Sequence, residues 1–485
     1  MDYLFLFLLS INIISGILLF PYPINMFILA ISSRKWKDPQ IEEYYEESEL
    51  PNVTIQLPIF NESRIIQRTL SNLTKLLYPK VKLHIQILDD STDQTSSILD
   101  TEVKSLKKQE FNIEVIRRRS REGYKAGALA NGINHGVSEF VVIFDADFQL
   151  NPHFLKLSIH HFKNNDQIGA IQTRWAHSNL NYSLFTRSMA IGLDGHFFVE
   201  KPGRKRRNGF ITFNGTGGIW RRSAIEECGG WSSATLAEDL DLAYRAQMKG
   251  YEVIYLRDVT NSQEIPPTIR CWIIQQSRWS KGFSQNLRKN YLSFWRNSRG
   301  KSRIQGTLHQ TQYVVPLLIL LITITSSLLL FFPEFDGKML AIFGFFYSIV
   351  AILGIFTYIV SIMRAKRPVK DILLIPLFLF WGAGLIVRMG LATISGLIRK
   401  GGVFERTPKF NLFNDQKRSS ITFKEKIPLD KVFLAELAYV AIISLGLLKG
   451  IELGGLYLLQ VVFYLFILLS VLNLLFSELK HAFTR

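Results

Sequence analysis

Cysteine is almost absent from this chain of 485 residues, which has Cys228 and Cys271 and no others. Two cysteines placed in this way give neither a disulfide framework nor the spacing of a metal-binding motif. We therefore expect both thiols to be reduced and structural, as is usual in a cytosolic domain.

Acidic residues are also outnumbered, with 40 Asp and Glu against 57 Lys and Arg, and the net charge is +17. The sequence contains no recognised nucleic-acid-binding module, so we predict no nucleic-acid partner. The basic residues gather beside apolar runs, as they do on the cytoplasmic flanks of membrane spans. The charge excess therefore indicates a membrane protein.

Long apolar runs are present in the sequence. Hydrophobic residues make up 48% of the chain, and residues 4–31 and 313–476 are mostly apolar. Runs of about 20 apolar residues predict membrane spans. The first run lacks a basic n-region and a small-residue cleavage site, which favours a retained anchor over a signal peptide. Pro21 and Pro23 are expected to kink or break its helix.

Charge also predicts the topology. Basic residues at 33–37 and 288–303 place the intervening region in the cytosol. A crossing at 372–397 would put a basic loop outside, and this segment contains Arg388, so we predict an interfacial or re-entrant helix, with a further span as the alternative. The predicted parts are an anchor (1–31), a cytosolic domain (32–310) and a membrane region (311–485) with spans at about 313–332, 339–363, 433–449 and 453–476, an interface helix at 372–397 and a cytosolic loop at 399–432.

The first half of the cytosolic region alternates apolar strand patterns with helical patterns, which predicts a parallel sheet with helices on both faces. Ligands of such sheets bind beyond the carboxyl ends of the strands. Two strands end there in acid pairs, Asp89-Asp90 and Asp145-Ala146-Asp147. One such pair is compatible with a helix cap or a turn. Two pairs at corresponding strand ends predict a functional site.

Two more motifs follow. Glu238-Asp239 opens a helical pattern and would by itself be an ordinary acidic helix N-terminus. Gln275–Trp279 reads QQSRW within an amphipathic stretch. Arginine offers a rigid fork for phosphate oxygens, and tryptophan offers a flat face for a sugar ring. Alternatively, Trp279 would simply mark the membrane boundary, but this interpretation does not explain the two glutamines.

In this order the motifs D, DxD, ED and QxxRW resemble those of the processive, inverting, membrane-bound glycosyltransferases of the cellulose synthase superfamily, in glycosyltransferase family 2. The similarity is greatest to the plant cellulose synthase-like A and C groups, which make mannan or glucomannan and the glucan backbone of xyloglucan, and to their bacterial relatives. The sequence segments that carry this resemblance lie within residues 53–282 and include QLPIFNE, IQILDDSTD, GYKAGAL, FDADF, FNGTGGIWR, AEDLDLAYRA and QQSRWSKG. Ala237 departs from the usual Thr or Val before Glu-Asp. The resemblance implies an α/β GT-A (Rossmann-like) cytosolic domain combined with an all-α transmembrane region.

The resemblance also implies an activity and roles for single residues. Hexose would pass from a nucleotide-diphosphate sugar, GDP-mannose or UDP-glucose, to an oligosaccharide or polysaccharide acceptor. Asp147 and Asp145 would hold Mg²⁺ or Mn²⁺, and Asp239 would be the general base with Glu238 as its orienting neighbour. The implied donor-binding residues are Asp89, Asp90, Lys125, Asp145, Gln275, Arg278 and Thr407, and the implied acceptor-binding residues are Trp279, Asn214, Gly215 and Thr216.

Residues 404–409, FERTPK, resemble the gating loop FxVTxK of cellulose synthases, with Arg406 in the valine position. That loop is cytosolic in the family and follows an interface helix, and its closure would bring Thr407 to the donor and exclude water. The resemblance thus implies a multi-pass enzyme of the cell membrane with a cytosolic catalytic domain. Its partners would be the lipid bilayer and accessory export proteins.

Three other functions remain open at this stage. A non-processive enzyme that glycosylates a lipid would use the same metal and base. A transporter or channel with an inert cytosolic domain would not need the complete set of acids. A glycoside hydrolase would need two carboxylates and no metal. The sequence does not fix the donor sugar, the linkage or the oligomeric state.

Overall fold

The computed structural model describes residues 3–412 and 431–483. One domain is built on a seven-stranded sheet with the order β3-β2-β1-β4-β6-β5-β7. The strands are β1 (Val53–Ile59), β2 (Leu83–Asp89), β3 (Asn112–Arg117), β4 (Phe140–Ile143), β5 (Ile168–His177), β6 (Gly218–Arg221) and β7 (Glu252–Gln263).

The sheet is mixed, whereas the alternating pattern predicted a parallel one. Strands β1 to β4 are parallel to one another, but β6 is antiparallel to both of its neighbours, β4 and β5. The reason is local. The Gly217 amide donates to the carbonyl of Ile143 at the carboxyl end of β4 (2.9 Å), so β6 starts at this edge and must run back along β4. This reversal places the loop before β6 beside the acids that follow β4.

Helices cover the sheet. Helix α5 packs on β1 and β2, α4 on β3, α9 on β5 and β6, and α10 on β7. The helices of this domain are α3 (Ile66–Leu73), α4 (Thr95–Lys108), α5 (Tyr124–His135), α6 (Phe154–Ser158), α7 (Leu184–Asp194), a π-helical turn η5 (Gly195–Glu200), α8 (Lys201–Arg206), α9 (Arg222–Glu227) and α10 (Glu238–Met248).

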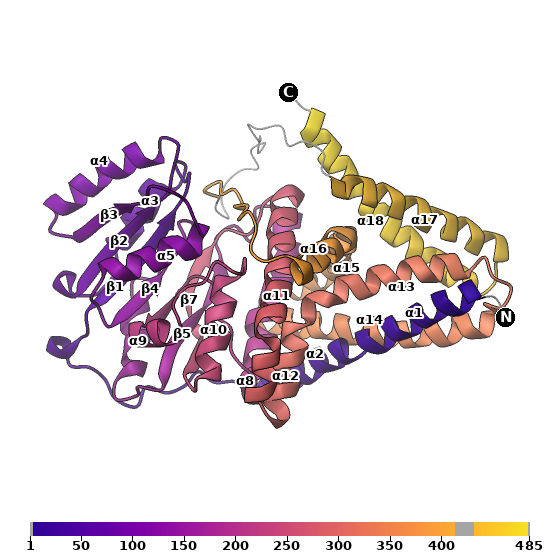
Figure 1. Ribbon diagram of the computed structural model, residues 1–485, viewed down its shortest axis with the longest axis horizontal. Coiled ribbons are helices and arrows are strands. Elements are labelled where there is room, and N and C mark those ends of the chain that lie inside the picture. The colour runs from indigo at the N-terminus through magenta and orange to yellow at the C-terminus, as the bar shows by residue number, and fades with distance from the viewer. Residues whose placement is uncertain (1–2, 413–430, 484–485) are drawn as a thin grey trace.

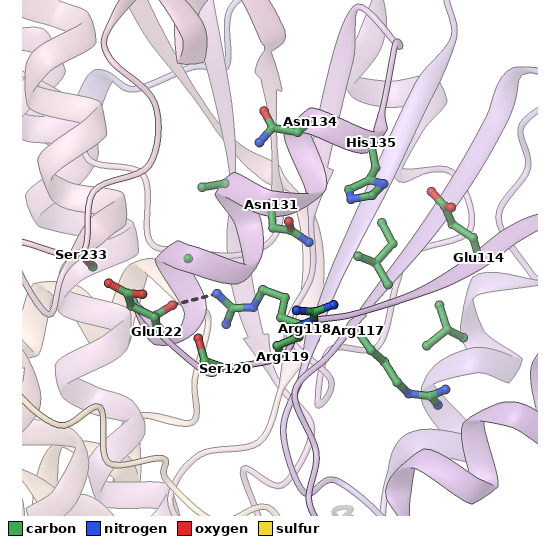
Figure 2. Close-up of a pocket in the computed structure, with 15 residues that line it drawn as sticks. Glu114, Arg117, Arg118, Arg119, Ser120, Glu122, Asn131, Asn134, His135 and Ser233 are labelled. Carbon is green, nitrogen blue, oxygen red and sulfur yellow. Dashed lines mark hydrogen bonds between the residues drawn. The ribbon is translucent and has the colours of Figure 1, made fainter.

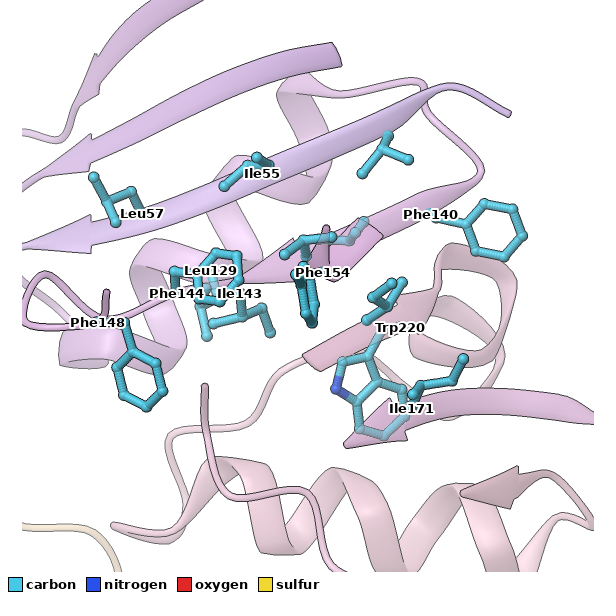
Figure 3. Close-up of a cluster of buried hydrophobic side chains, with 14 of the residues drawn as sticks. Ile55, Leu57, Leu129, Phe140, Ile143, Phe144, Phe148, Phe154, Ile171 and Trp220 are labelled. Atoms are coloured by element: carbon cyan, nitrogen blue, oxygen red, sulfur yellow. The ribbon is translucent and has the colours of Figure 1, made fainter. Parts of the chain in front are cut away.

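The core of this domain explains why β4 is an unbroken apolar run. All four residues of β4 are buried, and Phe144 continues the run beyond the strand. Around them lie Phe154, Trp220 and Leu129, from three other parts of the chain (Figure 3). A central strand covered on both faces has no polar side to present. Each large side chain buried here contributes about 1.5–3 kcal/mol of transfer free energy.

The rest of the molecule is helical, and the polar helix α11 stands between the sheet and the apolar helices (Figure 1). These helices are α1 (Tyr3–Leu19), α2 (Pro21–Ser32), α11 (Ile269–Asn297), α12 (Gly300–Gln310), α13 (Val315–Leu329), α14 (Gly337–Arg364), α15 (Ile375–Gly384), α16 (Ile386–Ile398), α17 (Lys431–Leu453) and α18 (Tyr457–Phe483). Pro21 stands in the first turn of α2, where its missing N–H costs no hydrogen bond, so the chain starts a new helix there.

Five helical segments in the described residues are long and apolar enough to cross a membrane, and a sixth would be the bent pair α15 and α16. The five are Tyr3–Lys35, Gly300–Leu329, Gly337–Arg364, Lys431–Leu453 and Tyr457–Leu479. An α/β domain joined to apolar helices agrees with the predicted fold class. The division into anchor, cytosolic domain and membrane region stays a prediction.

The segment predicted as an interface helix is broken. Helices α15 and α16 meet at a bend of 52° next to Leu385. Such a break fits either a bent span or a re-entrant segment, so the placement of 372–397 stays a prediction. The predicted loop at 399–432 is described as far as residue 412, and its remainder up to residue 430 lies outside the described residues.

Arg388, the charge inside this apolar segment, is buried in an ion-pair cluster. Its guanidinium contacts Glu436 of α17 (2.8 Å) and Glu478 of α18 (2.5 Å), and Glu478 also pairs with Arg270 of α11 (2.8 Å). Four helices therefore meet through two arginines and two glutamates. The cluster ties the bent pair to the last two helices and to α11.

We predict that Arg388→Met strongly destabilises the protein, because it deprives the buried Glu436 of its guanidinium. Breaking a buried pair in this way costs about 3–5 kcal/mol. The measurement is thermal or denaturant unfolding of the purified protein in detergent. The control is Arg399→Met, which removes an exposed arginine just after α16 and should change stability by less than about 0.5 kcal/mol. Equal stability of both variants would show that the cluster is not needed for folding.

Candidate active site

The predicted acids lie at the carboxyl edge of the sheet because β2 and β4 are parallel to β1, which lies between them. Asp89 accepts hydrogen bonds from Arg117 Nε (2.8 Å), Ser96 Oγ (2.7 Å) and the Ser91 amide (3.0 Å). Burial raises the pKa of Asp89, but these donors outweigh burial and lower it. The contacts of Asp89 are therefore to the strand β3 and the start of α4.

Asp90 is also paired, with Arg118 Nε at 3.0 Å and its terminal nitrogen at 2.5 Å. Arg118 donates in addition to the carbonyl of Glu122, and both residues line a polar groove of about 810 Å³ beside α5 (Figure 2). The run Arg117–Arg119 was not singled out in the sequence, although three arginines after a strand are a signal for anion binding or acid pairing. The donor contacts predicted for Asp89 and Asp90 stay predictions.

Lys125 lies in the first turn of α5 and joins three segments. Its Nζ donates to Asp145 Oδ1 (2.6 Å) and to the carbonyl of Gly215 (2.9 Å), and it lies 4.0 Å from Glu238 Oε1. Burial lowers the pKa of Lys125, but Asp145 and Glu238 outweigh burial and raise it, so the ammonium stays charged. The structure thus brings together residues that are far apart in the sequence and were predicted to form one site.

The loop before β6 completes this arrangement. Thr216 Oγ1 accepts from the amide of Asp145 (2.9 Å). Gly215 has φ +78°, and a Cβ added there would lie 3.0 Å from Asp239 Oδ2. This left-handed conformation and the close carboxylate both require glycine. Residues 214–216 therefore lie against the acids of α10.

Glu238 and Asp239 form the first turn of α10. Burial and the charge of Asp239 raise the pKa of Glu238 to about 7, and Lys125 acts in the opposite direction. Burial also raises the pKa of Asp239, again opposed by Lys125. The ionised form of Asp239 thus disfavours ionisation of Glu238, and a carboxyl group with a raised pKa is better suited to act as a general base.

Asp147 faces a different lysine. Its Oδ2 contacts Lys409 Nζ at 2.7 Å and accepts from the amide of Glu264 at 3.3 Å. Lys409 belongs to the loop after α16, the FERTPKF segment. The carboxylate of Glu264 in turn accepts from the amides of Phe410 (3.0 Å) and Leu412 (3.2 Å), which fixes this end of the loop over the sheet.

The two carboxylates after β4 suit a divalent cation. Asp145 and Asp147 each already hold an ammonium group within 2.7 Å, so the site attracts cations. In the described residues, no cluster of three or more His, Cys, Asp or Glu side chains could hold a metal. One or two carboxylates are the usual number for Mg²⁺ that also binds substrate phosphates. The residues therefore fit a cation bound together with a diphosphate.

The QQSRW motif lies on α11, beside the same loop. The guanidinium of Arg278 stacks over the ring of Phe404 at 4.5 Å. Burial lowers the pKa of Arg278, and the nearby Glu238 and Asp145 oppose this. Gln275 is buried, and Trp279 is half-buried against the core of the sheet domain.

The described part of the loop lies across the site. Phe404 stacks on Tyr124 (6.4 Å), Arg406 forms an ion pair with Glu62, and Gln285 donates to the carbonyl of Gly401 (2.5 Å). Thr407 is buried, and its Oγ1 has no hydrogen-bond partner among residues 3–412 and 431–483. The loop is therefore anchored on both sides of the acids.

Comparison with known proteins agrees with this geometry. Residues 51–282 match the family model described as glycosyltransferase like family 2. The chain is 38% identical over 269 residues to the probable glucomannan 4-beta-mannosyltransferase 10 of Arabidopsis thaliana, an alignment that covers 55% of this chain and 49% of the relative. It is 34% identical over 365 residues to the probable glucomannan 4-beta-mannosyltransferase 4 of Oryza sativa subsp. japonica, covering 73% of this chain and 64% of the relative. The chain thus spans about half to two thirds of the length of these relatives.

Among solved structures, the mannosyltransferase PcManGT from Pyrobaculum calidifontis, in complex with GDP-Man and Mn²⁺, is similar in fold. Its TM-score is 0.54 at 20% identity, and the match covers 74% of this chain and 98% of the other. The predicted GT-A fold and the predicted resemblance are confirmed. Residues 51–282 therefore form a domain of the glycosyltransferase-like family 2, homologous to the plant glucomannan 4-beta-mannosyltransferases.

Proposed function

We propose that this protein is a membrane-embedded, processive, inverting hexosyltransferase that extends a β-mannan or β-glucan from a nucleotide sugar. The observation that carries the proposal is the position of Lys125, whose ammonium lies between Asp145, on the donor side, and Glu238, beside the candidate base. One buried site then holds both the leaving group and the attacking hydroxyl. GDP-mannose is the favoured donor because the relatives above are named mannosyltransferases, and UDP-glucose is the alternative.

The proposed reaction is one displacement at the anomeric carbon. The acceptor hydroxyl attacks this carbon, its proton passes to Asp239, and the bond to the diphosphate oxygen breaks on the opposite face, which inverts the centre. The charge of Asp239 raises the pKa of its neighbour Glu238. Arg278 would bind the departing diphosphate as a charged fork, and Trp279 would stack on the acceptor sugar.

Asp145 and Asp147 would hold Mg²⁺ or Mn²⁺, which supplies charge neutralisation at the diphosphate when bound. The loop with Thr407 and Lys409 would cover the donor and exclude water. In this proposal the domain lies on the cytosolic side of the cell membrane. The apolar helices carry the product toward the bilayer, and accessory export proteins stay a prediction.

The decisive experiment is a donor screen with protein purified in detergent. We expect Mn²⁺- or Mg²⁺-dependent release of GDP from GDP-mannose and a polymeric product. Asp239→Asn should reduce transfer by about 10²–10⁴-fold, the usual contribution of a general base, while donor binding persists. Asp147→Ala should lose the metal-dependent donor binding as well. A product limited to a lipid monosaccharide would contradict processivity, and turnover that survives EDTA would contradict the metal.

The acid pair predicts a pH dependence. The base must be ionised, so transfer should fall as the pH drops through the pKa of Asp239, which burial raises above its usual value. The charge of ionised Asp239 raises the pKa of Glu238, so Glu238 is still neutral while Asp239 titrates. Glu238→Gln, which places a neutral side chain at this position, should therefore leave the acid limb of kcat in place. A limb that shifts to lower pH in this variant would show that Glu238 is charged when Asp239 titrates.

The contact of Lys409 with Asp147 predicts a competition for cations. Lys409→Met removes the ammonium 2.7 Å from Asp147 Oδ2, so Mn²⁺ should bind more tightly in the absence of donor, by about tenfold (~1.4 kcal/mol). Electron paramagnetic resonance of free Mn²⁺ measures this directly. Lys400→Met, a change at an exposed lysine of the same loop, is the control and should leave the affinity unchanged. Equal affinities in both variants would refute the competition.

A further inference from the structure

A chain of polar side chains runs from Asn214 into the interior of the domain. His196 and Glu200 lie on the π-helical turn η5, with His196 Nδ1 2.7 Å from Glu200 Oε2. The other ring nitrogen, Nε2, lies 3.2 Å from Asn214 Nδ2. Beyond Glu200, Arg204 donates to Oε1 at 2.6 Å. None of these residues except Asn214 belongs to a motif of the sequence analysis.

Glu200 determines which nitrogen of His196 carries the proton. Burial raises the pKa of Glu200, but Arg204 and His196 outweigh burial and hold it far below its usual range, so this carboxylate is ionised. Burial lowers the pKa of His196, so its ring is neutral at neutral pH. A carboxylate can only accept, and the ring proton therefore sits on Nδ1. Nε2 is left with a lone pair.

That lone pair determines the orientation of the Asn214 amide. Only the NH₂ group of the amide can donate to Nε2, and this agrees with the short distance to Nδ2. The amide oxygen then points away from the imidazole. Asn214 Oδ1 is buried and has no hydrogen-bond partner among the described residues. A buried acceptor without a protein donor is usually satisfied by an ordered water or a ligand.

The neighbours of Asn214 indicate which ligand would supply the donor. The backbone of Asn214 is fixed by Gln172, whose Oε1 accepts from its amide at 2.6 Å. The next residue, Gly215, lies against Asp239 Oδ2 and gives its carbonyl to Lys125. Asn214 Oδ1 therefore belongs to the loop that borders the base that would deprotonate the acceptor. A sugar hydroxyl is a donor of the right kind.

We propose that His196, oriented by Glu200, is a positioning residue that makes Asn214 present its amide oxygen to a hydroxyl of the acceptor sugar. This inference rests on the proposed function. His196 acts through Asn214 and does not itself contact the sugar. If the His196–Glu200 pair only held η5 in place, its loss would affect donor and acceptor reactions alike.

The test separates transfer to a sugar from transfer to water. Wild type, His196→Leu, His196→Gln, Asn214→Ala and the double variant His196→Leu/Asn214→Ala are compared at saturating donor. One assay varies the concentration of β-1,4-linked mannotetraose or cellotetraose and gives KM and kcat. The other measures hydrolysis of the donor without acceptor. His135→Leu is the matched control, since His135 is an exposed histidine at the end of α5.

We expect His196→Leu to raise the acceptor KM about tenfold, the effect of one hydrogen bond, while donor hydrolysis stays within about twofold of wild type. Asn214→Ala should raise it to the same extent, and the double variant no further, because both changes remove one interaction. His196→Gln keeps an amide oxygen that can accept from Asn214 and should restore most of the affinity. His135→Leu should behave as wild type.

Three results would overturn the inference. They are a parallel loss of hydrolysis and transfer in His196→Leu, an additive effect of about a hundredfold in the double variant, and an unchanged acceptor KM. Failure of the proposed function looks different, because the wild type would then transfer hexose to neither tetraose, and both proposals would fall together. A His196→Leu protein that does not fold is replaced by Asn214→Asp, whose carboxylate would face the acceptor nitrogen Nε2 of His196 and should weaken acceptor binding while hydrolysis persists.

Discussion

One ammonium group organises the site. The side chain of Lys125 is 14% exposed, and its Nζ lies within 4.0 Å of oxygens from three segments, the residues after β4, the loop before β6 and the first turn of α10. Buried carboxylates are costly unless a cation is near. Without this lysine, Asp145 and Glu238 would lose the cation that they share. This interaction joins Asp145 after β4, the left-handed Gly215 and the start of α10.

Much of the site could be predicted from the sequence because its parts are local. An acid pair directly after an apolar strand must lie at the edge of the sheet, so the location of Asp145 and Asp147 could be predicted from the sequence. The direction of β6 could not be predicted, since its four residues carry no signal of orientation and only the Gly217–Ile143 hydrogen bond shows why it turns back. Lys409 stood in a predicted loop, but its partner lies 262 residues away. His196 and Glu200 belong to no sequence motif, and only the folded structure shows that they lie beside Asn214.

For the helices outside the sheet domain, too, the sequence predicted the elements but not the contacts between them. The apolar runs predicted helices, and Arg388 was recognised as unusual within one of them. Its partners Glu436 and Glu478 come from two helices later in the chain. A single buried charge in a sequence therefore indicates that a partner exists, but only the packing of α16, α17 and α18 identifies it. Comparison with relatives adds the family and leaves the sugar to experiment.

The contact between Lys409 and Asp147 couples the position of the loop to the concentration of divalent cations. When this lysine leaves and a divalent cation enters, the charge at the carboxylate rises by one unit, not two, so the exchange gains less electrostatic free energy than cation binding at a carboxylate without a lysine. Release of Asp147 by Lys409 and uptake of the cation then form one equilibrium. In the proposed enzyme, Lys409 neutralises Asp147 while the site is empty, and the arriving donor with its cation displaces the lysine by mass action.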